Sequence, residues 1–588
     1  MLFNLPAPRN RTDGIMKPFF PRPVLEAPGN RWDWALLPLV LATLVLLAYG
    51  VQQMARPYVV GEALPLSLSP AWLPYYLLRT TLRMFLALGV SLVFSVGFAL
   101  LAARSRFAGK LLVPLLDILQ SIPVLGFLSL TVSGFIGLFP GSLLGVECAA
   151  IFAIFTSQAW NMAFSLYQAM QTVPEELQEA SRMLQLSSWQ RFMRLELPFA
   201  MPSLLWNMMM SMSGGWFFVV ASEAISVANH DIKLPGIGSY IALAIEAQDT
   251  AAVGWAILAM LLGILLYDQL FFRPLIAWAD KFRFEESSSE SAASSWLLDA
   301  MRRTLLMRRL LVQAQAVFDR AMAATRRRFD TAQQTPRARF THPAWTRVGN
   351  VLVALLVAAA CWRLLRFVHA EVGWSEAGHV MLLGAYTLVR VAVLTVLAAL
   401  VWVPVGIWIG LHPRVAARVQ PVVQFLAAFP ANLMFPLTVA LIVRWRLNPE
   451  IWLSPLMMLG SQWYLLFNVV AGASSIPAEL RFAAGNLGLR AGLKWRRYLL
   501  PAVFPSFVTG ALTASGGAWN ASIVAEYVSW GSTSLQAHGI GSYVASMTAA
   551  GDFPRIALGI GVMCLYVMAL NHFVWQRLYA LAQDRMHF

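Results

Sequence analysis

Long apolar stretches restrict the fold of this chain more than any other feature of its sequence. Each is far longer than a β-strand, and a segment in lipid must satisfy its backbone groups internally, so we expect helices. Charged residues make up 12% of the 588 residues, about half of the roughly 25% typical of soluble proteins. The predicted fold class is therefore an all-α integral membrane protein with about twelve transmembrane helices. The expected spans are 34–55, 78–103, 111–138, 143–169, 199–226, 251–273, 349–369, 376–411, 417–443, 450–474, 502–528 and 555–578.

Basic residues indicate the orientation of these spans. "RSRFAGK" at 104–110 carries three positive charges after the second span, whereas "PYVVGEALPLSLSPAW" at 57–72 and "FPGS" at 139–142 carry none. Cytoplasmic loops of membrane proteins are rich in Lys and Arg, so we predict that both termini are cytoplasmic. The same rule accounts for the net charge of +15 better than nucleic-acid binding does.

An internal duplication divides the spans into two halves. Arg83 and Arg390 lie 307 residues apart, and later matches lie 303 apart, such as the motif "GIGSY" at 236–240 and 539–543. We therefore predict two parallel six-helix repeats, related by an axis along the membrane normal. The expected domains are an N-terminal cytoplasmic segment at 1–33, a first transmembrane domain at 34–280, a linker at 281–345 and a second transmembrane domain at 346–588.

The linker is hydrophilic and basic. Residues 285–295 are rich in serine, and residues 296–329 combine apolar residues at helical spacing with repeated arginine pairs. Such a pattern is typical of an amphipathic helix on the cytoplasmic membrane surface. A solvated linker helix without lipid contact fits the pattern equally well.

Two polar segments interrupt the apolar pattern at equivalent places. "EASRMLQLSSWQRFMRLELP" (179–198) follows the fourth span of the first half, and "FAAGNLGLRAGLKWRRYLLP" (482–501) follows that of the second. From Pro174 to Pro198, 9 of 25 residues recur 303 positions later. A plain connector would not need this matching, so we favour a two-helix knob beneath the membrane that transmits force from a cytoplasmic partner. Its first helix should start after a proline with acidic residues in the first turn, and its second should end at Pro198.

Both segments resemble the "EAA" loop in permease subunits of type I binding-protein-dependent ABC importers. That pattern has Glu-Ala-Ala, three residues, Gly, nine residues, an apolar residue, one residue and Leu-Pro. The first copy has Gln185 at the Gly position, and the second has Phe482 at the Glu position. The resemblance implies that the segments couple the permease to ATPase subunits. The coupling residues that it implies are Pro174, Glu176, Glu179, Ala180, Gln185, Pro198, Pro477, Glu479, Phe482, Ala483, Gly488 and Pro501.

The resemblance also implies the partners of the chain. Both transmembrane domains are fused, so we expect one copy per complex, two ABC ATPase subunits, an extracytoplasmic solute-binding protein, and membrane lipid in a bacterial inner membrane. The sequence contains no Gly-x4-Gly-Lys-[Ser/Thr] phosphate loop. The chain is therefore not expected to be an enzyme. ATP and Mg should bind to the partner subunits, and no cofactor or metal is expected on this chain.

Two further motifs resemble a subgroup of these importers. "VVASEAISV" (219–227) and "IVAEYVSWG" (523–531), each followed by "GIGSY", are similar to permeases for nitrate, sulfonate, taurine and bicarbonate. The implied solute is a small anion. Glu223 lies 21 residues after Pro202, or about 31 Å along a helix, which reaches the outer end of a hydrocarbon core of roughly 30 Å. We favour a structural or gating role for Glu223 and Glu526 over solute contact. Arg83 and Arg390 fall on the same side, where an Arg–Glu pair across helices is an open alternative.

The solute pathway is expected along the fifth spans and their neighbours. Most polar residues in spans only bond to neighbouring helices, and most tryptophans only pack. The glycine pairs at 214–215 and 516–517 are expected to permit close helix packing. The candidate pathway or gate residues are Asn207, Ser211, Ser213, Trp216, Glu223, Thr513, Ser515, Trp519, Asn520 and Glu526.

Three other functions are alternatives to the importer. A twelve-helix secondary transporter would need coupling charges near the bilayer midplane, and no convincing pair stands out there. A membrane enzyme would need a catalytic cluster, and the eight histidines are scattered. A scaffold would act through its basic linker. The three cysteines lie far apart in apolar stretches, which favours packing over disulfides or metal binding.

Overall fold

The structure, a computed structural model, describes chiefly residues 48–59, 64–121, 134–227, 230–279, 369–474, 478–487, 491–530 and 533–585. Within these residues, seven helices are long and apolar enough to cross a membrane, or eight if one bent pair is counted as a span. The N-terminal segment 1–33 lies outside the described residues. The expected spans 34–55 and 349–369 are described only in part, and the linker helix at 296–329 lies largely outside the described residues.

The chain forms two compact units that do not follow its two halves. The larger unit comprises Gly50–Thr172, Ser203–Tyr267 and Thr341–Phe588, and so contains spans of both halves. The smaller unit comprises Met1–Tyr49, Val173–Pro202 and Asp268–Phe340. The domain boundaries expected from the sequence stay a prediction.

The first half contributes five described helices of 16 residues or more to the larger unit, wholly or for most of their length. They are α2 (Leu73–Arg104), α3 (Arg106–Ser121), α5 (Leu144–Gln171), α8 (Leu197–Glu223) and α10 (Thr250–Tyr267). Helix α2 packs along α5. A short apolar helix, α9 (Ile237–Glu246), precedes α10.

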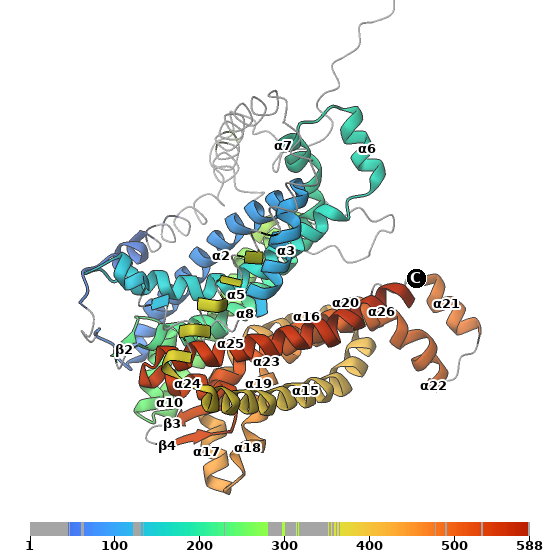
Figure 1. Ribbon diagram of the computed structural model, residues 1–588. Coiled ribbons are helices and arrows are strands. Elements are labelled where there is room, and N and C mark those ends of the chain that lie inside the picture. Colours follow the sequence, from blue (N-terminus) through green and yellow to red (C-terminus); the bar gives the residue numbers. More distant parts are fainter. Residues whose placement is uncertain are drawn as a thin grey trace, which may run out of the picture. The chain divides into compact units, whose positions relative to one another are not determined.

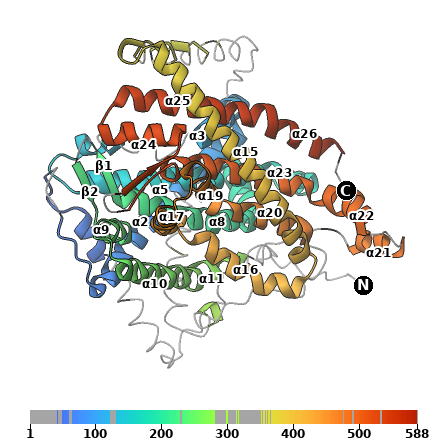
Figure 2. The same ribbon diagram turned by 90° about the horizontal axis from the view of Figure 1, so that it is seen from below.

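The second half repeats this order. It contains α15 (Trp374–Gly410), α16 (Pro413–Ala428), α17 (Phe435–Trp445), α18 (Pro449–Trp452), α19 (Ser454–Leu459), α20 (Gln462–Ser474), α23 (Leu500–Ala525), α24 (Ile540–Ala550), α25 (Phe553–Leu570) and α26 (Gln576–Arg585). Helices α15, α20 and α23 lie side by side (Figures 1 and 2).

Two expected spans of the second half are not single straight helices. The span predicted at 417–443 is split, because α16 ends at Ala428 and a 3-10 turn at Ala431–Met434 precedes α17. Pro430 lies at the break, and proline has no N–H for the helical ladder and clashes with the preceding turn. The span predicted at 450–474 is bent by 45° between α19 and α20.

A β-hairpin follows the fifth span in each half. Strand β1 (Ala224–Val227) pairs antiparallel with β2 (His230–Lys233), and β3 (Tyr527–Trp530) pairs with β4 (Thr533–Gln536). The expected spans 199–226 and 502–528 therefore extend too far, since the last residues of each are strand. Pairing in a hairpin satisfies the backbone groups that leave the helix. Strand β1 also lies beside α24 of the other half (Figure 2).

Proline does not end the second short helix of either polar segment, contrary to the sequence prediction. In the first half, α7 (Ser188–Arg191) continues through a π-helical turn, Phe192–Glu196, directly into α8. In the second, α22 (Ala491–Lys494) continues through the turn Trp495–Leu499 into α23. A wider turn absorbs a proline, since Pro198 and Pro501 cannot donate to the ladder.

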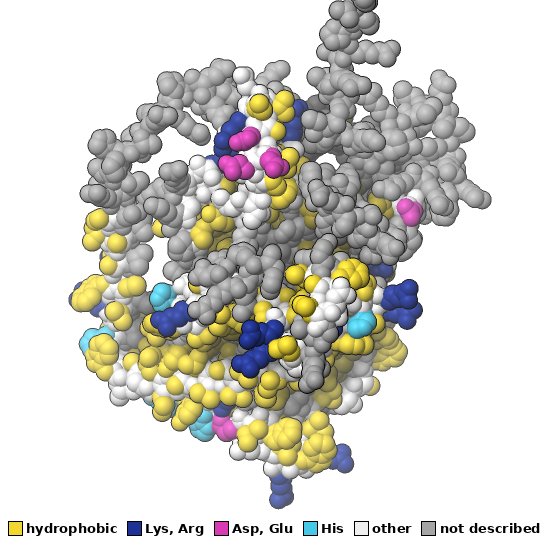
Figure 3. Space-filling model, turned by 90° about the vertical axis from the view of Figure 1, so that its right-hand side faces the viewer, with side chains coloured by type: hydrophobic (Ala, Val, Ile, Leu, Met, Phe, Trp, Pro, Cys, Tyr) yellow, Lys and Arg dark blue, Asp and Glu magenta, His cyan; other side chains and the backbone are white. Residues whose placement is uncertain are grey.

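Apolar side chains dominate both the interior and the surface of the larger unit. Its interior is packed from small and aliphatic residues, among them Ala149, Ala150 and Ala153 of α5. Its surface exposes large apolar side chains on the spans, such as Val93 (74%) and Leu400 (68%). Figure 3 shows one face on which hydrophobic side chains cover much of the described surface. Such a surface is suited to lipid rather than water.

Candidate functional site: ion networks and coupling segments

Four charged residues form an ion network in the first half, which we call the first ion network. Arg79 and Arg83 of α2 donate to Glu147 of α5, at 2.5 Å and 2.6 Å. Arg83 also donates to Glu223 at the end of α8, at 2.6 Å. All four side chains are at most 1% exposed. Because opposite charges pair in a dry site, the network ties three helices together, and removing one partner would leave a buried charge.

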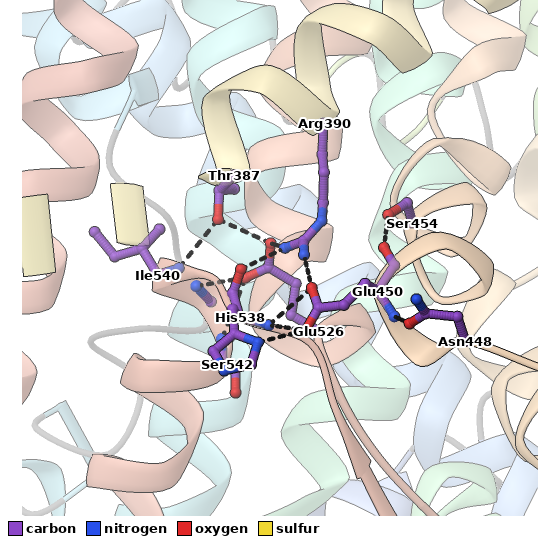
Figure 4. Close-up of polar contacts among 10 residues, drawn as sticks. Thr387, Arg390, Asn448, Glu450, Ser454, Glu526, His538, Ile540 and Ser542 are labelled. Carbon is purple, nitrogen blue, oxygen red and sulfur yellow. Dashed lines mark hydrogen bonds and ion pairs between the residues drawn. The ribbon is translucent and has the colours of Figure 1, made fainter. Parts of the chain in front are cut away.

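The second ion network joins Arg390, Glu450, Glu526 and His538 (Figure 4). Arg390 of α15 donates to Glu526 at 2.9 Å, and it also donates to Glu450 of α18. The ring of His538 approaches Glu450 with Nδ1 at 2.5 Å from Oε1. Here Glu450 is 33% and His538 79% exposed. The second ion network is therefore partly hydrated.

The "GIGSY" motif supports one carboxylate in each network. The N–H of Gly238 donates to Glu223 at 2.7 Å, and the N–H of Gly541 donates to Glu526 at 2.8 Å. A Cβ atom at Gly236 would overlap the Glu223 carboxylate. Each carboxylate thus lies at the N-terminus of a short helix, where N–H groups and the helix dipole favour negative charge. The glycines are needed because the carboxylate approaches so closely.

In each half a threonine hydroxyl bonds both to the glutamate and to a backbone N–H of the "GIGSY" motif. Thr80 donates to Glu223 at 2.7 Å and accepts from the N–H of Ile237 at 3.0 Å. Thr387 donates to Glu526 at 2.8 Å and accepts from the N–H of Ile540 at 3.0 Å. The Arg–Glu pair that the sequence left open is thus present in both halves, inside a larger bonded group.

The other candidate pathway residues lie on α8 and α23. Asn207 donates to Ser165 of α5 at 2.9 Å, and Thr513 donates back to its own helix. Trp216 and Trp519 are at most 1% exposed and stack on Tyr267 and Tyr566 of their own halves.

The remaining pathway candidates are mostly bonded within one helix. Ser213, Ser515 and Asn520 donate to carbonyls of their own helices. Ser211 is buried, and its hydroxyl has no partner among the described residues. A role of these residues in the pathway stays a prediction.

The first coupling segment has the helix start predicted for it. Helix α6 (Glu175–Met183) begins after Pro174 with Glu175 and Glu176 in its first turn. Glu176, Glu179 and Ala180 are exposed. A capping box of Ser187 and Gln190 then starts α7, which satisfies the free N–H groups of that helix end.

Gln185 lies between α6 and α7 with a φ of 49°. This is the left-handed region, which disfavours most side chains and which glycine enters freely. The loop pattern has Gly at this position, so the backbone geometry accounts for the family preference. The equivalent Gly488 of the second half lies outside the described residues, as does Pro477.

The second coupling segment exposes apolar side chains. Helix α21 (Ala478–Asn486) presents Phe482 with 73% exposure, and Ala483 is exposed beside it. The side chain of Glu479 lies outside the description. Two apolar residues that the sequence analysis did not single out are also exposed at equivalent positions, Leu184 (63%) and Leu487 (75%). Their retention 303 residues apart inside a polar segment was the signal for them.

Comparison with known families assigns both halves to one family. The model of the "binding-protein-dependent transport system inner membrane component" matches residues 95–272 and 402–587, more than half of the chain. The chain belongs to this family. It is a permease component of an ABC importer, and its two matches show the fusion of two such domains in one chain.

Several curated permeases resemble parts of this permease. A nitrate import permease protein of Synechocystis is 28% identical over 186 residues, which cover 31% of this chain and 62% of that protein. A bicarbonate transport system permease protein of Synechococcus elongatus is 30% identical over 142 residues, or 24% of this chain and 50% of that protein. The chain thus matches less than two thirds of the length of these relatives.

Three charged residues of the networks in this permease were not predicted from its sequence: Glu147, Glu450 and Arg79. Glu147 and Glu450 are separated by the same 303 residues as the other pairs, and each lies at the start of an apolar stretch. That repeat was available as a signal. Arg79 had none, because its equivalent position holds Tyr386. His538 likewise has no equivalent, since Pro235 occupies its place.

Proposed function

We propose that this permease forms the solute pathway of an ATP-driven importer between its two halves and that two ATPase subunits dock on its two coupling segments. The observation that carries the proposal is the presence of both segments in one chain. One follows α5 and leads into α8, and the other follows α20 and leads into α23. A partner that moves a segment would therefore move a span.

The exposed side chains suit docking on a partner. Leu184 and Leu487 offer apolar contact at equivalent positions. At the equivalent positions of Glu179 and Phe482, one half offers a charge and the other an aromatic ring. Losing one partner of a desolvated charge pair costs about 2–5 kcal/mol, and full burial of a Phe side chain contributes roughly 1.5–3 kcal/mol. The two ATPase sites thus differ in chemistry, with two different ATPases or one that accepts both.

The coupling segments and both termini face the cytoplasm in this proposal, where the ATPase subunits bind ATP and Mg. The ion networks lie at the other ends of α8 and α23, toward an extracytoplasmic solute-binding protein. The basic segments that follow even-numbered spans support this orientation. The bacterial inner membrane is the location expected for such a complex.

The proposed solute is a small oxyanion, with nitrate and bicarbonate as first candidates. The support is the names of the relatives, a nitrate import permease and a bicarbonate transport permease. Glu223 and Glu526 do not oppose an anion, because each is paired with an arginine. The resemblance of the sequence motifs keeps sulfonates and taurine among the candidates.

The mass of the native complex tests the assembly. The chain of 65.1 kDa, tagged and purified with its partners from its own host, should appear once beside two ATPase subunits. A complex that contains two copies of this chain would refute the proposed stoichiometry.

Single substitutions test the coupling assignment. Glu179→Lys should reduce solute-stimulated ATP hydrolysis through charge reversal, and Phe482→Ala should weaken ATPase docking through lost contact. Leu258→Ala is a control, since Leu258 is exposed on α10 (43%) away from either segment in sequence. The coupling assignment is wrong if both segment variants behave like the control.

A further inference from the structure

Helix α8 of the first half meets α20 of the second half along one face. Trp206, Met210 and Gly214 recur every four residues, which places them on one side of α8. Met210 packs with Phe467 in one apolar cluster, and Trp206 meets the Phe467 ring edge to face at 6.4 Å. This face of α8 is therefore a seam between the two halves.

Gly214 and Tyr464 approach each other closely in this seam. A Cβ atom at Gly214 would overlap the Tyr464 hydroxyl oxygen, while the next nearest atom, Cζ of the same ring, would be 3.7 Å away. The phenolic oxygen of Tyr464 is therefore the atom that would clash with a Cβ atom at position 214. Gly214 lies 17 residues after the start of α8 and 9 before its end, or about 25 Å and 13 Å along the helix. The contact falls inside the apolar part of the span.

The Tyr464 hydroxyl is free to donate a hydrogen bond to a ligand. It makes no hydrogen bond to any residue that the structure describes, whereas the Tyr543 and Tyr566 hydroxyls of the same half are bonded to Glu376 and to the Met381 carbonyl. The Tyr464 side chain is half-buried. A hydroxyl without a protein partner, at a seam between the two halves, can donate to a passing solute.

The helix that carries Tyr464 is also the one that bends. Tyr464 stands in the first turn of α20, directly after the 45° break at Gly460–Ser461. The equivalent helix of the first half, α5, runs unbroken from Leu144 to Gln171 and has Asn161 at this position. In transporters, broken helices inside the membrane mark solute sites and moving elements.

We propose that Gly214 and Tyr464 form the constriction of the solute pathway and that the Tyr464 hydroxyl donates a hydrogen bond to an oxygen of the passing oxyanion. The proposal rests on the proposed function, in which solute crosses between the halves. The constriction closes when the hydroxyl meets Gly214 and opens when α20 moves at its break. In the closed seam the Tyr464 hydroxyl has no acceptor among the described residues, and an oxygen of the oxyanion would accept its hydrogen bond.

A double-mutant cycle on the full complex separates the steric role from the chemical role. Uptake of labelled nitrate and bicarbonate and the rate of ATP hydrolysis are measured for Gly214→Ala, Tyr464→Phe and the double variant. Gly214→Ala should lower both maximal rates, because the new methyl group meets the hydroxyl and the Tyr464 side chain must shift. Tyr464→Phe should raise KM for the transported anion about ten- to hundredfold, as expected for one lost hydrogen bond to a charged group.

The double variant decides between the roles. Removing the phenolic oxygen leaves the methyl group in ordinary contact, so maximal uptake and ATP hydrolysis should recover while KM stays high. Gly516→Ala is the matched control, because a Cβ there meets nothing within 4 Å, and it should behave like the unmodified protein.

The ATP hydrolysis readout keeps the proposal testable if neither anion is transported. In that case the proposed solute is wrong, and rescue of Gly214→Ala by Tyr464→Phe still reports the constriction. A double variant as impaired as Gly214→Ala overturns the constriction. An unchanged KM in Tyr464→Phe, for an anion that the complex does transport, overturns the hydrogen bond.

Discussion

The first and second ion networks both link charged residues of several helices, but they differ in their exposure to water. The first places two arginines against two glutamates, and none of these side chains is more than 1% exposed. The second has one arginine between two glutamates, and its fourth member is the exposed ring of His538. Charge pairs sealed from water cannot exchange their partners for solvent, whereas hydrated ones can. We infer that the ion network holds the helices of the first half together more rigidly, near the end of α8, than the second network does near the end of α23.

The same contrast recurs elsewhere in the two halves. Helix α5 is continuous from Leu144 to Gln171, while α19 and α20 are bent by 45°. We infer that the second half carries more of the movement during transport. The following experiments test that difference.

Loss of the central arginine should have the largest effect. Arg83→Met leaves Glu147 and Glu223 buried with one remaining cation, so unfolding should become easier by about 3–5 kcal/mol. Arg390→Met should cost less, about 1.5–3 kcal/mol, because water reaches Glu450. Thermal unfolding of the detergent-solubilised complex measures both. Equal losses would remove the distinction between the networks.

Arg79 and Tyr386 occupy equivalent positions of the two halves. Placing each residue in the other half should make the stability of the two networks more alike. Arg79→Tyr should destabilise the complex by about 1.5–3 kcal/mol, since Glu147 loses one charged hydrogen bond. Tyr386→Arg should stabilise it by at most about 1 kcal/mol and slow solute uptake by fastening the second half. Faster uptake in Tyr386→Arg would contradict the assignment of movement to that half.

Salt should change the stability effect of substitutions in the second network but not of those in the first. His538→Ala should change stability by less than about 1 kcal/mol, because the ring is exposed and its interaction with Glu450 is screened. The difference from the unmodified protein should disappear as salt is raised from about 0.1 to 1 M. The loss in Arg83→Met should persist in the same titration, which makes that variant the control.

The smallest effect is expected at the coupling segments. Gln185→Gly gives the first segment the residue that the second has at Gly488, and it relieves a left-handed backbone that costs a non-glycine residue about 1–2 kcal/mol. Part of this gain is lost to the greater freedom of glycine when unfolded. Solute-stimulated ATP hydrolysis should stay within about twofold, and a large loss would show that the Gln185 side chain itself contacts the ATPase.

Sequence reasoning located the repeated elements well because duplication preserves them. The first-turn acids of α6 follow from residues retained at a fixed separation. The Arg83–Glu223 pair was an open alternative that rested on the same repeat, and the hinge at Gln185 follows from the resemblance to the loop pattern. Features present in one half gave no such signal. Arg79, His538 and the bend before Tyr464 became visible only once the structure placed their partners.

The β-hairpins were missed for a different reason. Each strand has four residues, and β1 continues directly from the apolar run of α8. Periodicity cannot separate four extended residues from one more helical turn at the end of such a run. The contact of Gly214 with Tyr464 was equally hidden, because glycine in a span predicts close packing but does not identify the neighbour.

The bend in only one of two equivalent helices has a consequence for inheritance. When two identical polypeptides assemble, any mutation is expressed at both positions, so a kink useful on one side must also be tolerated on the other. With both positions encoded in a single gene, Tyr464 and Asn161 are separate loci, and selection can act on each alone. A library that varies residues 460–464 while leaving 157–161 untouched would therefore sample properties that no symmetric assembly can reach.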